Sequence, residues 1–213
     1  MREIQCLKPH PHPKDKFGSL IIDYSQDNPF LEWPTEMLFE CLKVALKQNK
    51  MNLEIATLIW RHLKTVDGNH DKAKEIILQA GGNLIPWLGG IHYRISHLVK
   101  TFKPQKSKGK NCKVYFILLT ENKMTPKPWG LYIGQTSHTI ENRFAEHLDE
   151  INKKKSRHVY RRGWQILDSI SAQVPAMARS DVLRFERMAL DSLKGILKSK
   201  TIRGLNPKHV KGA

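Results

Sequence analysis

Five polar side chains in the second half of the chain are of types that together can hydrolyse a phosphate ester: Tyr115, Tyr132, Arg143, His147 and Glu186. This reaction needs an activated water, neutralisation of the charge on the phosphate, and help for the leaving oxygen. Glu186 offers the hard carboxylate oxygens that Mg²⁺ or Mn²⁺ prefers, and waters and substrate phosphate can complete the coordination. Each residue alone is better explained as a structural or surface residue, so the hypothesis rests on the combination.

The spacing of Arg143 and His147 supports a shared role. They are four positions apart, which places both side chains on one face of a helix. A guanidinium can hold a phosphate through two parallel hydrogen bonds, and an imidazole can orient a tyrosine, pass a proton or contact phosphate. Tyrosine, with an ordinary pKa of about 10, is a poor base at neutral pH unless a metal or Arg143 lowers that pKa. Tyr115 and Tyr132 are therefore assigned as a pair to positioning water.

The elements that would carry these residues follow the order β-β-α-β-α. The apolar run 114–119 and the segment 131–134 predict two strands of an antiparallel hairpin. A helix is predicted from an N-cap at Thr139 to Ile151, a third strand over 163–174, and a long amphipathic helix over 182–197. Ser180 and Asp181 are the predicted caps of that last helix. The predicted fold class is α+β with a small domain built on a central antiparallel sheet.

The first half of the chain has a helical periodicity instead. Four helices are predicted between residues 34 and 99, after an irregular arm. Trp33, Trp60 and Trp87 are interpreted as core aromatics of this helical domain. A basic, breaker-rich linker separates it from the second half. The predicted divisions are residues 1–102, 103–112 and 113–213. Target recognition or dimerisation is expected of the first.

The chain carries a formal net charge of +16, and most of it lies in the second half. Residues 1–103 contribute +3 and residues 104–213 contribute +13. This bias indicates a polyanionic partner, most simply the phosphate backbone of a nucleic acid, whereas a soluble basic surface with no partner is the alternative. Duplex DNA fits the charge, and RNA stays open. The predicted phosphate contacts are Lys113, Lys153, Lys154, Lys155, Arg161 and Arg162.

Cysteine usage and hydropathy exclude several other classes of protein. Cys6, Cys41 and Cys112 are widely spaced and odd in number, which argues against a disulfide framework or a zinc site and favours a reducing cytoplasm. No apolar run approaches the roughly 18 residues of a membrane span, and the polar start of the sequence lacks a secretory apolar region. A cytoplasmic protein is expected.

The order and spacing of the polar residues resemble the GIY-YIG nuclease family over roughly residues 113–207. The matching positions are Tyr115, Tyr132-Ile133-Gly134, Arg143, His147, Glu186 and Asn206 before Pro207. Lys113 departs from the pattern, because the family has glycine at the start of its first motif. The two motif tyrosines are also 17 positions apart, and the surplus falls in a proline- and lysine-rich loop where insertions are tolerated.

The resemblance implies a GIY-YIG fold and a nuclease in which Glu186 binds Mg²⁺ or Mn²⁺, one tyrosine acts as general base, and Asn206 belongs to the catalytic set. The leading hypothesis is a divalent-metal-dependent endonuclease that hydrolyses DNA, of restriction or phage type, with a homodimer as one expected assembly. The alternatives are a non-catalytic nucleic-acid-binding protein on a decayed nuclease scaffold and a nuclease toxin acting on DNA or RNA. Retention of Arg143 and Glu186 favours the enzyme over the decayed scaffold.

Overall fold

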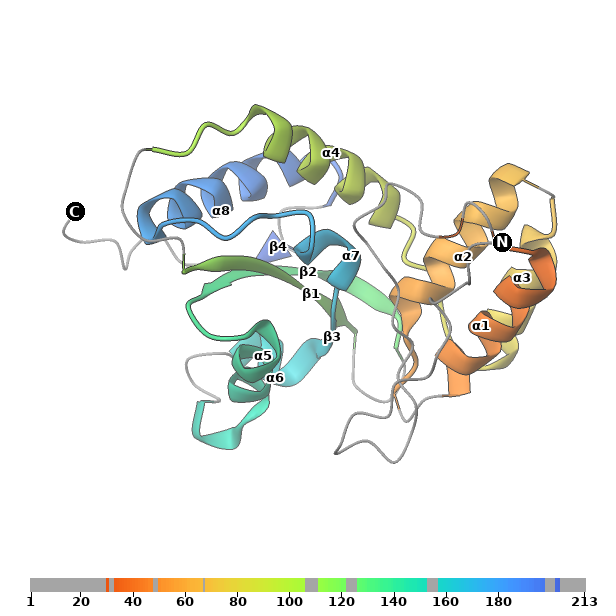
Figure 1. The fold of residues 1–213 in the computed structure, drawn as a ribbon. Helices are drawn as coiled ribbons and strands as arrows, with labels where there is room; N and C mark the ends of the chain where they lie inside the picture. Colours follow the sequence, from red (N-terminus) through yellow and green to blue (C-terminus); the bar gives the residue numbers. More distant parts are fainter. Residues whose placement is uncertain are drawn as a thin grey trace. The chain divides into compact units, whose positions relative to one another are not determined.

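The computed structural model describes residues 30, 33–47, 50–66, 68–105, 111–121, 126–152, 157–197 and 202–203. The chain divides into two compact units, Met1–Pro86 and Trp87–Ala213. In the described residues the first unit contains helices and the second contains a sheet flanked by helices (Figure 1). The α+β class predicted from the sequence is confirmed.

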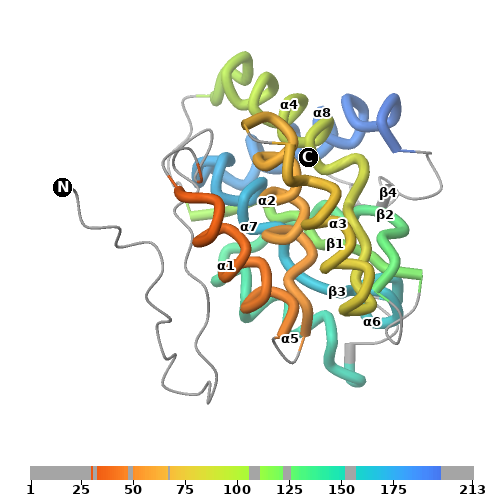
Figure 2. The backbone as a smooth tube through the Cα atoms, turned by 90° about the vertical axis from the view of Figure 1, so that its right-hand side faces the viewer, coloured from red at the N-terminus to blue at the C-terminus, as the bar shows by residue number. Residues whose placement is uncertain are grey.

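The first unit is built from α1 (Thr35–Lys47), α2 (Leu53–Val66) and α3 (His70–Gln79). Their apolar side chains recur every three or four residues and meet in one core, so each helix packs on the other two (Figure 2). Trp33 is buried in this core and Trp60 packs against it, as predicted for both.

The second unit contains a four-stranded sheet in the order β3-β1-β2-β4. Its strands are β1 (Lys113–Thr120), β2 (Pro128–Thr136), β3 (Gly163–Ile166) and β4 (Ile202–Arg203). β1 pairs antiparallel with both β2 and β3, whereas β4 pairs parallel with β2. Every residue of β1 after Lys113 is buried, which explains why this strand is a continuous apolar run in the sequence. The predicted hairpin of the first two strands is confirmed.

Helices cover both faces of this sheet (Figure 1). On one face lie α5 (Ile140–Leu148) and α6 (Arg157–Arg162), and on the other lie α4 (Leu88–Thr101), α7 (Asp168–Ser171) and α8 (Arg179–Leu193). Successive side chains of a strand point to opposite faces. Tyr115, Ile117 and Leu119 accordingly join the apolar cluster beneath α5 and α6. Val114, Phe116 and Leu118 point to the face covered by α4, α7 and α8.

The domain boundary predicted from the sequence is wrong for α4. This helix was expected to be the fourth helix of the N-terminal domain, but it belongs to the second unit and packs against α8 and α7. Leu88, Ile91, Ile95 and Leu98 form its buried stripe. His92 also fastens it to α7, because its Nε2 lies 2.7 Å from the Ser169 hydroxyl. Trp87, which precedes α4, is half-buried and is likewise part of the second unit.

The third predicted strand is also wrong in length. β3 ends at Ile166, and residues 168–171 form α7 instead of continuing the strand. The Leu167 amide still donates to the Phe116 carbonyl at 2.8 Å, and the Leu167 carbonyl then accepts from the amides of Ile170 and Ser171, so the helix begins directly after the strand. α8 begins earlier than predicted, at Arg179 after Ala178, so Ser180 and Asp181 lie inside its first turn rather than capping it.

No described helix is both long enough and apolar enough to cross a lipid bilayer.

The position of α4 yields a test of the boundary. A fragment of residues 87–213 should unfold cooperatively in urea, whereas a fragment of residues 103–213 should unfold at a much lower urea concentration or lack a cooperative transition. The four buried side chains of α4 are expected to contribute about 1.5–3 kcal/mol each. Circular dichroism during urea denaturation measures the difference. Equal midpoints for the two fragments would show that the sheet domain does not need α4.

Candidate active site

The register of β1 and β2 brings the two tyrosines together. Tyr115 pairs with Gly134, and Tyr132 pairs with Ile117 two positions along, so both tyrosines lie on the sheet face beneath α5. Their ring centroids are 6.1 Å apart with an interplanar angle of 37°. Tyr115 is 1% exposed and Tyr132 is half-buried. The sequence prediction of two adjacent tyrosines on neighbouring strands is confirmed.

Gly134 leaves the space that the two tyrosine rings occupy. A Cβ added there would lie 2.5 Å from both the Cζ and the Oη of Tyr115, and 2.7 Å from Cε1 of Tyr132. Real Cβ atoms do not approach other atoms so closely, and both rings would have to move. Packing therefore requires glycine at position 134, whether or not the segment Tyr132-Ile133-Gly134 is a family motif.

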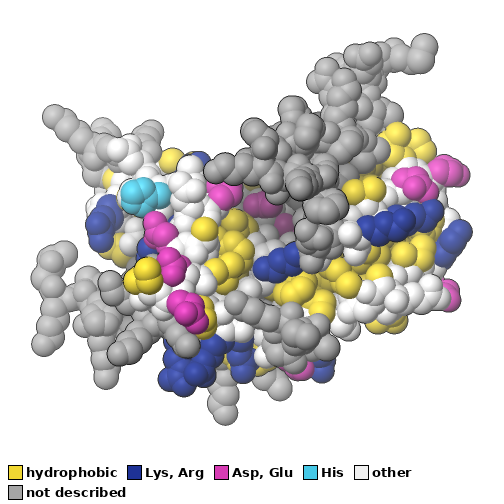
Figure 3. Space-filling model, turned by 90° about the horizontal axis from the view of Figure 1, so that it is seen from below, with side chains coloured by type: hydrophobic (Ala, Val, Ile, Leu, Met, Phe, Trp, Pro, Cys, Tyr) yellow, Lys and Arg dark blue, Asp and Glu magenta, His cyan; other side chains and the backbone are white. Residues whose placement is uncertain are grey.

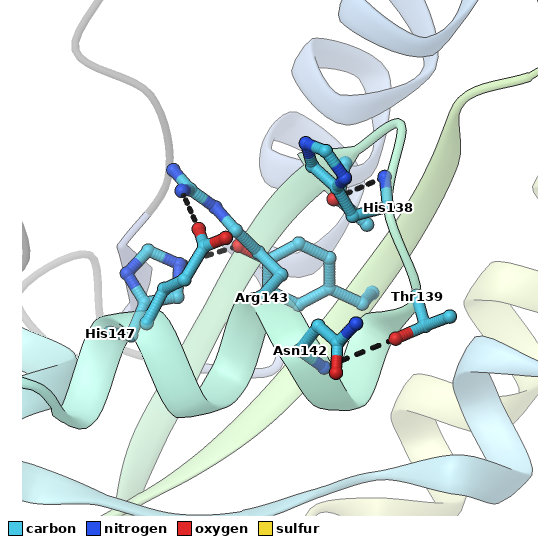
Figure 4. A network of polar contacts seen from close by, with 8 residues as sticks. His138, Thr139, Asn142, Arg143 and His147 are labelled. Carbon is cyan, nitrogen blue, oxygen red and sulfur yellow. Dashed lines mark hydrogen bonds and ion pairs between the residues drawn. The ribbon is translucent and has the colours of Figure 1, made fainter.

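Arg143 and His147 both project from α5 toward the same side of that helix (Figure 4). The helix begins as predicted, because the Thr139 side chain accepts a hydrogen bond from the Asn142 amide at 3.2 Å. His147 is 3% exposed, and its Nε2 lies 2.6 Å from the Tyr115 hydroxyl oxygen. The His147 ring also meets the Tyr132 ring edge-on, with centroids 5.4 Å apart.

Burial controls the protonation of the Tyr115–His147 pair. Burial, followed by the neighbouring Tyr132, raises the pKa of Tyr115, and the positive charge of Arg143 only partly opposes this rise. Burial and the charge of Arg143 lower the pKa of His147 to about 4. At neutral pH both groups are therefore uncharged. The Tyr115 hydroxyl oxygen and His147 Nε2 therefore meet as two neutral groups, and the imidazole tautomer decides which of them donates.

Arg143 stands at the border between this buried pair and solvent. Its Nη1 donates to Oε2 of Glu146 at 2.5 Å, and the two side chains are 41% and 43% exposed. Its charge also acts on both tyrosines, where it lowers the pKa against the effect of burial. Glu146 was missed in the sequence analysis. The sequence contains one indication of this contact, because Glu146 follows Arg143 by three positions on the same predicted helix and can pair with it.

Glu186 reaches the site from α8. It is 2% exposed. Burial is the main cause that raises the pKa of Tyr132, and the negative charge of Glu186 is the second cause. The Glu186 carboxylate and the Tyr132 hydroxyl are therefore within electrostatic reach of each other. The sequence placed Glu186 on the last long helix, and the structure brings it near one of the two tyrosines.

The resemblance implies a divalent cation, and the buried carboxylate of Glu186 is the group that would hold it. Within the described ranges, no group of three or more His, Cys, Asp or Glu side chains could hold a metal ion. A single carboxylate suits Mg²⁺, which keeps several waters and takes its other oxygens from a substrate phosphate. A structural zinc site, with four protein ligands, would not fit. Glu186 is thus the residue that would hold Mg²⁺ or Mn²⁺.

The other predicted site residues lie in different places. Asn206 and Lys153–Lys155 fall outside the described residues. Lys113 is exposed at the start of β1 and pairs regularly with Thr136, so its replacement of a glycine does not disturb the strand. Arg161 is exposed on α6, and the Arg162 guanidinium stacks 4.0 Å above the Trp129 ring. Seen from the side of α5 and α6, the described lysines and arginines form separate groups among apolar and acidic side chains (Figure 3).

No protein-family model, no curated protein and no solved structure matches this chain.

Replacing Gly134 by alanine should destabilise the second unit by about 1–3 kcal/mol, because the added methyl collides with both tyrosine rings. Urea denaturation measures the change. Gly195→Ala is the matched control, since nothing lies within 4 Å of its added Cβ, and it should change stability by less than about 0.5 kcal/mol. Equal effects of the two substitutions would contradict the packing described at Gly134.

The lowered pKa of His147 predicts a pH-dependent stability. The unfolded chain binds a proton at this residue below about 6.5, whereas the folded protein resists protonation until about pH 4. Stability should therefore fall as the pH drops through this window, by up to about 3 kcal/mol. His147→Gln should remove that part of the pH dependence in urea denaturation at pH 7 and pH 4.5. The exposed His97, changed to Gln, should leave the dependence as in the parent protein.

Proposed function

We propose that this protein is a divalent-metal-dependent endonuclease that hydrolyses DNA phosphodiester bonds at the site formed by Tyr115, Tyr132, Arg143, His147 and Glu186. The observation that supports it most is the buried hydrogen bond between Tyr115 and His147, beside an arginine and within reach of a carboxylate. These groups come from two strands and two helices. Their motif order resembles that of GIY-YIG nucleases.

The Tyr115–His147 pair can move a proton without becoming charged first. A water held against the Tyr115 oxygen can give that oxygen a proton while the hydroxyl proton passes to His147 Nε2, 2.6 Å away. Tyr115 alone would be a poor base because burial raises its pKa. His147 Nε2 carries no proton in one neutral tautomer and can take the proton transiently, although its lowered pKa of about 4 makes it a weak base. Tyr115 is thus the more suitable of the two tyrosines for general-base work, and Tyr132 for positioning.

Arg143 and Glu186 would handle the phosphate. The half-exposed guanidinium can bind two non-bridging oxygens and neutralise charge that develops as water attacks. A divalent cation bound by Glu186 would supply further charge neutralisation and help to the leaving oxygen. A net charge of +13 over residues 104–213 favours DNA or another polyanion as substrate. The proposed class is a restriction- or phage-type enzyme with the first unit serving recognition.

Incubation with supercoiled plasmid and Mg²⁺ tests the proposal. The protein should nick or linearise the plasmid, and EDTA should stop the reaction. Arg143→Ala and Glu186→Gln should each reduce the cleavage rate by about 10²–10³-fold, because each removes charge neutralisation from the transition state.

Asp191→Asn is the matched control for Glu186→Gln. It lies on the same helix and removes the same charge, but its exposed carboxylate pairs with Lys194. It should cleave at the rate of the parent protein. Cleavage indifferent to EDTA, or unchanged in both site variants, would overturn the assignment. Binding of DNA without any cleavage would favour a non-catalytic binding protein, and cleavage of RNA alone would favour the toxin.

A further inference from the structure

Glu146 holds the arginine that a substrate phosphate would need. Its Oε2 accepts from Arg143 Nη1 at 2.5 Å, and both residues project from α5 (Figure 4). The hydrogen bond from Arg143 lowers the pKa of Glu146, so the carboxylate is ionised at neutral pH. At neutral pH the positive charge that faces it is that of Arg143.

A carboxylate and a phosphate make the same kind of contact with a guanidinium. Both present two oxygens to its parallel N–H groups, and both are negatively charged. An arginine already paired with a carboxylate must lose that partner, or share its donors, before it can grip a phosphate. The like charges of Glu146 and phosphate also repel each other at this short range.

The Arg143–Glu146 pair is of the kind that a substrate can displace. Both side chains are more than two-fifths exposed, and exposed ion pairs of this type contribute little to stability. The pair links neighbouring turns of one helix, so breaking it requires no movement of α5. The buried Tyr115–His147 hydrogen bond would stay in place when Glu146 swings into solvent.

We propose that Glu146 occupies Arg143 in the free protein and must be displaced by a DNA phosphate before Arg143 can bind it. This inference rests on the proposed nuclease function. Glu146 raises the Kd of every duplex by the same factor, which leaves the ratio of their affinities unchanged but keeps a duplex with few other contacts unbound at low protein concentration. A cognate duplex, with more contacts elsewhere, displaces the carboxylate. Unspecific cleavage is thereby kept low.

The opposite role, in which Glu146 positions Arg143 for catalysis, predicts the opposite change. Removal of the carboxylate would then loosen the guanidinium and weaken both binding and cleavage. The two roles are distinguished by the sign of the effect.

Binding to a fluorescein-labelled 30-base-pair duplex of arbitrary sequence, measured by fluorescence anisotropy in EDTA, tests the inference. Glu146→Gln should lower Kd by about three- to tenfold, because Arg143 is released and a negative charge leaves the site. It should also raise the rate of plasmid cleavage with Mg²⁺ at protein concentrations below Kd. Thermal denaturation checks that the variant is folded.

Glu141→Gln is the matched control. Glu141 is an exposed carboxylate on the same helix, so its substitution removes the same charge as Glu146→Gln does. It should change Kd by less than about twofold, because residues two apart on a helix do not face each other. In an Arg143→Ala background, Glu146→Gln should change Kd no more than Glu141→Gln does.

The inference would be overturned if Glu146→Gln tightened binding no more than Glu141→Gln does, or if it weakened binding and slowed cleavage. Neither result would affect the nuclease assignment if the parent protein cleaves DNA. A parent protein that neither binds nor cleaves nucleic acid would remove the proposed function and this inference together.

Discussion

The pairing of β1 with β2 puts Gly134 directly opposite Tyr115, and this one position without a side chain leaves room for both tyrosine rings. A slip of one residue would turn Tyr132 to the other face of the sheet and place a branched side chain against Tyr115. The side chains of Phe116 and Leu118 point to the opposite face of β1 and are fully buried there, and this burial fixes the register. The apolar core therefore fixes the geometry of the polar site through the two-residue period of β1.

Burial gives the site its chemical character as well as its shape. Tyr115 and His147 stay uncharged because a charge on either would lose its hydration, and their hydrogen bond satisfies both groups inside the protein. Arg143 remains charged because it lies at the edge and meets Glu146 there. The result is a buried neutral pair next to a solvent-facing cation, an arrangement that suits the proposed phosphate hydrolysis.

Local signals in the sequence sufficed for the parts of the site that depend on local structure. The strand period of 114–119, the cap at Thr139 and the four-residue step from Arg143 to His147 each follow from backbone geometry, and the structure contains all three. Long-range packing could not be derived in this way. An amphipathic helix such as α4 carries no mark of its partner, so it was assigned to the wrong unit. The alternation in 163–174 fitted a strand, although the chain turns into α7.

The role of Glu146 could not be predicted from the sequence, and the physical reason differs from that for α4 and β3. An acidic residue three positions from an arginine on an exposed helix is usually a weak solvated pair, and the sequence gives no reason to treat it otherwise. Its importance arises only when the arginine is seen beside Tyr115, because the same guanidinium then has a buried neighbour on one side and a carboxylate on the other. The tyrosine and histidine hold their places through the core, whereas the Arg143 guanidinium interacts both with the buried Tyr115 hydroxyl and with Glu146, whose contact is exposed to solvent. The exposed half of the site is therefore the half that a substrate can rearrange.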